Sequence, residues 1–134
     1  MYIWETNLEI CKIVNQLDKD IEGEQLTPSK IEGLNRIAVH SGYYACLNKI
    51  RQLNNLKGFE TVKGGLGSHT EIIDCLNKYE DLPDKNEIMR TMRKLKEYRK
   101  KADYEDGNSN LFSRDPVDRI IKTCEKTFNT LNKL

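Results

Sequence analysis

The sequence lacks the features that mark membrane proteins and strongly basic proteins. No apolar run approaches the roughly 18 residues that a membrane-spanning helix needs. Glu5 and Glu9 interrupt the N-terminal stretch where a signal peptide would carry its apolar segment. The net charge is only +1, so the chain as a whole is not a polycation that seeks nucleic acid. We therefore expect a cytoplasmic protein without membrane contact, and we expect no reading of DNA sequence.

Metal-binding patterns are also missing. The only two histidines are His40 and His69, and neither has a second ligand at the spacing of an HExxH-type site. The four cysteines lie in separate apolar segments and form no CxxC pair: Cys11, Cys46, Cys75 and Cys124. Such cysteines are typical of reduced thiols in a core. We therefore predict no metal site and no cofactor.

What the sequence does contain is helical periodicity in a chain of 134 residues, the length of one domain. Apolar residues recur every three or four positions in five segments, and no segment alternates as a strand would. These segments are 3–21, 28–55, 68–79, 84–103 and 115–131. The pattern predicts an all-α protein, a four- to five-helix up-and-down bundle that forms a single domain over residues 1–134.

Helix-start signals support these boundaries. Thr27 followed by Pro28 predicts the N-cap and first residue of the second helix, which is apolar or small on nearly every side and should be central. Gly42 in its middle indicates a close helix contact. Start signals of the same kind precede the later helices: Ser68 with Glu71, Asp84 with Glu87, and Asp115 before Pro116.

One charge interrupts the apolar face of the segment 84–103. Arg99 falls inside the stripe formed by Ile88, Met92, Leu95 and Ala102. An arginine keeps its charge, so an inward one needs a carboxylate, a hydrogen-bond network or an anionic ligand.

Asp103, one turn after Arg99, leaves two interpretations open. The pair can be an internal i,i+4 ion pair that fixes helix register. Alternatively, Arg99 presents its charge to a phosphate in a cleft, with Tyr104 stacking or donating a hydrogen bond nearby. Residues 90–101 hold seven Lys and Arg against one acid, Glu97, and this basic strip is either a solvated face or a phosphate contact.

The two histidines have functional and ordinary interpretations. His69 stands at a helix start, where backbone N–H groups can meet an anion, or it is simply exposed. His40 lies within the second helix as a hydrogen-bonded or surface histidine.

Three stretches resemble the HEPN superfamily, and within it the small standalone prokaryotic branch. They are a small-residue Tyr-Tyr-Ala helix around Ser41–Ala45, a Lys-x-His-Ser-like helix start within 63–74, and an Arg-x-x-Ala-Asp-Tyr signature at Arg99–Tyr104. The resemblance implies a helical bundle that is commonly a homodimer, with its polar residues near the dimer cleft. Many members are metal-independent ribonucleases of toxin–antitoxin, antiphage or RNA-processing systems.

The sequence departs from the family pattern where a histidine follows the arginine by four to six residues. Asp103 and Tyr104 stand there instead, and a carboxylate beside a guanidinium stays ionised and donates no proton readily. We therefore expect RNA or nucleotide binding in a toxin–antitoxin or phage-defence setting. The expected ligand-binding residues are Arg99, Asp103, Tyr104, Lys100 and Tyr44.

Two alternatives remain open. One is a metal-independent endoribonuclease whose catalytic residues are Arg99 and a histidine from another helix, His69. The other is a structural helical interaction module. The resemblance also implies a homodimer and a nucleotidyltransferase-type protein partner.

Overall fold

The protein is built of helices, and the all-α prediction is confirmed. The computed structural model describes residues 8–13, 28–59, 68–105, 107 and 109–133, and no strand occurs in these ranges. Residues 8–13 are helical, and the remainder of the predicted helix 3–21 lies outside the described residues. The helices that follow are α2 (Pro28–Leu56), α3 (Ser68–Asp74), the 3-10 turn η1 (Cys75–Lys78), α4 (Lys85–Tyr104), the 3-10 turn η2 (Ser109–Phe112) and α5 (Arg114–Leu131).

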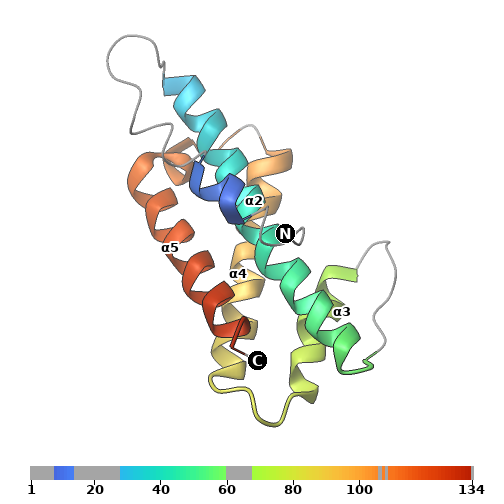
Figure 1. Cartoon of the computed structure of the whole chain (residues 1–134). Coiled ribbons are helices and arrows are strands. Elements are labelled where there is room, and N and C mark those ends of the chain that lie inside the picture. Colours follow the sequence, from blue (N-terminus) through green and yellow to red (C-terminus); the bar gives the residue numbers. More distant parts are fainter. Residues whose placement is uncertain (1–7, 14–27, 60–67, 106, 108, 134) are drawn as a thin grey trace.

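Helix α2 is the central element, as its composition predicts. It packs against α5, α4 and α3, whereas α4 and α5 come close to each other at few points. Figure 1 shows α4 running antiparallel to both α2 and α5. Side chains of α2 that are at most 1% exposed form the middle of the core: Ala38, Val39, Tyr43, Ala45, Cys46, Leu47 and Ile50.

Gly42 has the packing role that its position indicates. A Cβ at this residue would lie 3.0 Å from the Cys124 Sγ and 3.2 Å from the Cys11 Sγ. The absence of a side chain therefore lets the cysteines of two other helical segments approach α2.

The four cysteines are buried and unpaired, which confirms the prediction of reduced core thiols. Burial raises the pKa of the Cys11 and Cys75 thiols, while the hydrogen bond to Cys46, followed by burial, raises that of Cys124.

Several helix boundaries differ from the sequence-based ones. Helix α2 begins at Pro28 as predicted, while Thr27 lies outside the described residues. Asp84 is the N-cap residue of α4, as predicted, but its backbone is left-handed (φ 57°) and its side chain makes no capping hydrogen bond. An N-cap needs extended backbone to point its oxygen at the first turn. Helix α5 starts one residue early, at Arg114, after an extended N-cap at Ser113.

The third helix is shorter than its apolar pattern predicts. It ends at Asp74 and tightens into the 3-10 turn η1, after which Tyr79 is extended. The Tyr79 hydroxyl donates a hydrogen bond to the Asn54 Oδ1 (2.9 Å), and this contact fixes the chain against α2. Separately, none of the described helices is long and apolar enough to cross a bilayer.

Candidate functional site

Arg36 of α2 fixes the C-terminal end of α4, where the predicted signature lies. The last turn of a helix leaves backbone carbonyls without intrahelical partners. The Arg36 guanidinium donates to four backbone carbonyls at this end and just beyond it, those of Lys101 (2.8 Å), Ala102 (3.2 Å), Glu105 (2.7 Å) and Gly107 (2.8 Å). The Glu32 carboxylate balances its charge at 2.8 Å. This arrangement holds the end of α4 against α2.

Arg99 points inward, as its helical phase predicts, and is only 6% exposed. Its Nη1 lies 3.5 Å from the Asp103 Oδ2, which is longer than the roughly 2.7–2.9 Å of a strong charge-assisted hydrogen bond. Its Nε is buried without a hydrogen-bond partner among the described residues. The guanidinium therefore retains hydrogen-bonding capacity that the described part of the chain does not use.

Three tyrosine rings surround this guanidinium. The Arg99 Cζ lies 5.5 Å from the ring centre of Tyr43, 5.6 Å from that of Tyr44 and 5.8 Å from that of Tyr104. Cation–π contacts at these distances stabilise the charge of the Arg99 guanidinium in surroundings that water reaches only in part. Tyr104 is itself 77% exposed, so this ring forms the outer side of the group.

His40 meets the Asp103 carboxylate from α2. Its Nδ1 lies 3.0 Å from Oδ1 and 2.9 Å from Oδ2, and its ring packs on Tyr44 with centroids 4.7 Å apart. The His40 side chain is 46% exposed, against 20% for Asp103. An Nδ1–H that donates to a carboxylate fixes the orientation of an imidazole and leaves Nε2 for other chemistry.

His69 joins the same group from the first turn of α3. Its Nδ1 lies 3.0 Å from the Tyr43 hydroxyl oxygen, and its ring contacts those of Tyr43 and Tyr44. Burial lowers the pKa of His69, and the positive charges of Arg99, Lys96 and Arg51 lower it further. Burial raises the pKa of Tyr43. These directions favour a neutral imidazole that accepts the Tyr43 hydrogen.

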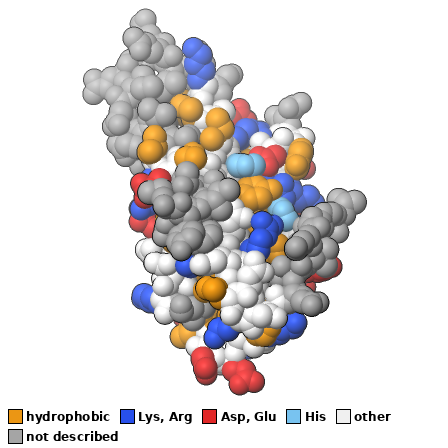
Figure 2. All heavy atoms as spheres, turned by 45° about the vertical axis from the view of Figure 1, so that its right-hand side comes forward, with side chains coloured by type: hydrophobic (Ala, Val, Ile, Leu, Met, Phe, Trp, Pro, Cys, Tyr) orange, Lys and Arg blue, Asp and Glu red, His pale blue; other side chains and the backbone are white. Residues whose placement is uncertain are grey.

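We call this group the Arg99 cluster. It consists of His40, Tyr43 and Tyr44 from α2, His69 from α3, and Arg99, Asp103 and Tyr104 from α4. Figure 2 shows both histidines on one face of the molecule, with hydrophobic and basic side chains around them. The described residues contain no group of three or more His, Cys, Asp or Glu that could hold a metal ion.

The structure brings together five of the six residues singled out from the sequence: Arg99, Asp103, Tyr104, Tyr44 and His69. Lys100 is exposed on α4, and no hydrogen bond, ion pair or cation–π contact joins it to the cluster in the described part of the chain. Sequence reasoning gave Tyr43 no ligand-binding role and placed His40 among ordinary histidines. Their i,i+3 and i,i+4 spacing puts His40, Tyr43 and Tyr44 on one face of α2, a signal that could have found them.

The cluster combines three chemical capacities: a guanidinium for an anion, an exposed aromatic ring for stacking, and a carboxylate-bound imidazole for proton transfer. The family model of the HEPN domain matches residues 38–134, a range that contains every member of the cluster. No curated protein and no solved structure matches the chain.

Proposed function

Because the chain belongs to the HEPN domain family, we propose that it binds single-stranded RNA or a nucleotide through the Arg99 cluster. The observation that carries this proposal is the buried Arg99 guanidinium, whose Nε is unpartnered among the described residues, beside the exposed ring of Tyr104. Arginine matches phosphate geometry, and tyrosine rings stack nucleobases of any sequence.

Asp103 and His40 set the charge that a phosphate would meet. The Asp103 carboxylate alone would repel an anion. Its Oδ2 lies 3.5 Å from the Arg99 Nη1, so this weak ion pair leaves the guanidinium able to bind a phosphate as well. His40 donates a hydrogen bond to the same carboxylate from α2, so that Asp103 is held by groups from two helices.

Fluorescence anisotropy with a short, labelled single-stranded oligoribonucleotide tests the proposal. We expect Arg99→Gln and Tyr104→Ala each to weaken binding about tenfold or more, and Tyr104→Phe to retain it. Arg90→Gln is the matched control, because it removes the same charge from an exposed position of α4. Affinity should fall with salt, with a shallower dependence in Arg99→Gln. Equal affinity of Arg99→Gln and Arg90→Gln would contradict the proposal.

The contact between His40 and Asp103 favours a second candidate, a metal-independent endoribonuclease. In this scheme the ribose 2′-oxygen attacks phosphorus, the bond to the 5′-oxygen breaks, and the His40 imidazolium gives its proton to that leaving oxygen. Water takes the proton of the 2′-hydroxyl. We propose His40 for this role because Asp103 orients it, whereas the pKa of His69 is lowered and a neutral imidazole is a poor acid.

Cleavage of RNA in the presence of EDTA tests the second candidate. His40→Ala should abolish cleavage while oligonucleotide binding through Arg99 and Tyr104 stays measurable, and His69→Gln should reduce cleavage less. Cleavage by His40→Ala at the wild-type rate, or no cleavage by the wild type at any protein concentration, removes this candidate. RNA binding would stand in either case.

The finer implications of the resemblance stay predictions. These are membership of the branch with the Arg-x-x-Ala-Asp-Tyr signature, a homodimer, a nucleotidyltransferase-type partner, and the toxin–antitoxin or phage-defence setting. Light scattering tests the homodimer, and co-purification with the products of neighbouring genes tests the partner.

A further inference from the structure

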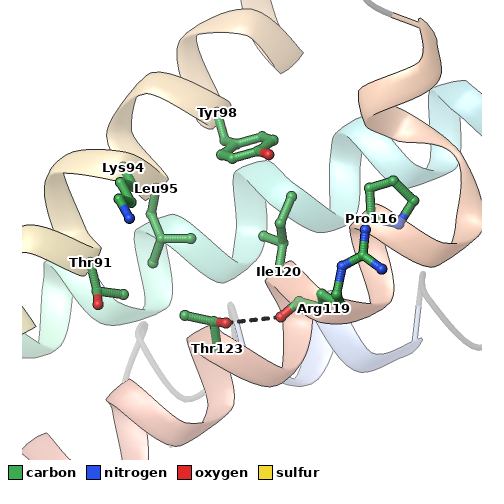
Figure 3. Close-up of a pocket in the computed structure, with 8 residues that line it drawn as sticks. All are labelled: Thr91, Lys94, Leu95, Tyr98, Pro116, Arg119, Ile120 and Thr123. Atoms are coloured by element: carbon green, nitrogen blue, oxygen red, sulfur yellow. Dashed lines mark hydrogen bonds between the residues drawn. The ribbon is translucent and has the colours of Figure 1, made fainter.

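A concave region lies apart from the Arg99 cluster, on another side of α4. It is a cavity of about 290 Å³ between α4 and α5, which we call the α4–α5 groove. Figure 3 shows Lys94 and Arg119 at opposite sides of it, with Leu95 and Ile120 between them and the Tyr98 ring above. The groove exists because α4 and α5 both pack on α2 while making little close contact with each other.

The polar groups of the groove select an anion. None of its lining residues carries a carboxylate. Within the described part of the chain, neither Lys94 nor Arg119 is ion-paired. The Thr123 hydroxyl donates to the Arg119 carbonyl (2.9 Å) and fixes that wall. Two uncompensated cations that face one concavity are complementary to negative charge at two points.

The floor of the groove selects an aromatic ring. Leu95 and Ile120 are 4% and 7% exposed, so their side chains form a packed apolar base. The half-buried Tyr98 adds a ring beside them. The volume lies at the lower end of the range for ligand sites and suits a single ring system with its substituents.

A neighbouring cavity along the same two helices provides an internal comparison. Its volume is similar, about 280 Å³, and it shares Thr91 and Thr123 with the groove, but its lining includes Asp84 and Glu87. A lining with cations and no carboxylate therefore distinguishes the groove from this cavity, and it does not follow merely from the spacing of α4 and α5.

We propose that the α4–α5 groove binds one nucleotide unit that carries phosphate on both its 5′ and 3′ sides. The base lies on Leu95 and Ile120 beside Tyr98, and the two phosphates meet Lys94 and Arg119. A free nucleoside 3′,5′-bisphosphate and an internal nucleotide of an RNA strand share this chemistry. The site is independent of the Arg99 cluster.

Isothermal titration calorimetry with adenosine 3′,5′-bisphosphate tests the groove. We expect the bisphosphate to bind more tightly than adenosine 5′-monophosphate, and Lys94→Gln or Arg119→Gln to weaken it about tenfold, the worth of one charge-assisted hydrogen bond. Lys126→Gln in the neighbouring cavity is the matched control and should leave the affinity unchanged. Arg99→Gln should also leave it unchanged, so failure of the proposed RNA site would not affect this result.

Three outcomes would overturn the proposal. They are no binding of the bisphosphate at millimolar concentration, equal weakening by Lys126→Gln, and loss of binding in Arg99→Gln alone. Competition by a short oligouridylate then identifies the source of the ligand. If the oligouridylate binds the groove more tightly than the bisphosphate does, the natural ligand is an RNA strand. If it binds less tightly, the natural ligand is the free nucleotide.

Discussion

Helix α4 carries a cation on each of two sides, one facing α2 and the other facing α5. Arg99 faces α2, where it is 6% exposed and surrounded by tyrosines and Asp103. Lys94 and Tyr98 face α5, where Lys94 is exposed and not ion-paired within the described chain. The difference follows from packing, since α2 contacts α4 closely and α5 does not. The cation on the first side is therefore enclosed by the packed helices, whereas the one on the second side is open to solvent.

The largest effect should come from removing the enclosed charge. We expect Arg99→Leu to lower the free energy of unfolding by about 2–3 kcal/mol, because it removes a buried guanidinium that contacts three tyrosine rings and Asp103. Lys94→Leu should change it by less than about 0.5 kcal/mol. Urea denaturation measures both values. The double variant Arg99→Leu with Asp103→Leu should recover part of the loss, and equal losses at Arg99 and Lys94 would break the comparison.

A smaller loss should follow from loosening the end of α4 that carries the Arg99 cluster. Arg36→Lys cannot reproduce the contacts of a planar guanidinium to four carbonyls, so we expect a cost of about 1–2 kcal/mol. Oligoribonucleotide affinity should fall with it, while binding in the α4–α5 groove should not change. Anisotropy and calorimetry on the same variant make the two measurements.

Two glycine substitutions in α2 should have opposite effects. Gly42→Ala places a Cβ 3.0 Å from the Cys124 Sγ of α5, and we expect a net loss of about 1 kcal/mol despite the better helix propensity of alanine. Gly33→Ala is the matched control. No atom lies within 4 Å of its Cβ, so we expect a gain of about 0.5–1 kcal/mol. Thermal unfolding measures both, and a gain at Gly42 would show that α5 moves freely on α2.

The smallest effect should be the pH dependence that His69 contributes. Folding lowers its pKa through burial and the nearby cations, so the unfolded chain binds this proton more readily. The stability contribution is therefore fully present above the unfolded value of about 6.5, and it is lost as the pH falls from there towards the folded pKa. Urea denaturation of wild type and His69→Gln across this range should show the difference. An NMR titration that gives His69 an unshifted pKa would contradict it.

Local patterns in the sequence predict much of this molecule. Helical periodicity gives the class of the fold, and the phase of α4 alone turns Arg99 inward, because a helix fixes the angle between its own residues. The contact between His40 and Asp103 was not predictable in this way, because its partners come from helices whose relative register depends on packing. The capping hydrogen bond expected from the Asp84 side chain is missing for a related reason, since the backbone there is left-handed and residue type alone does not reveal that.

The four buried thiols make the native protein its own reporter of local opening. A thiol reacts with an alkylating reagent as thiolate, and a raised pKa keeps that form scarce for Cys11 and Cys124 while the core is closed. Alkylation followed by peptide mass spectrometry would then rank how often each part of the bundle exposes its interior. Cys75, the first residue of the short turn η1, would be compared with Cys46 in the middle of α2 without altering a single residue.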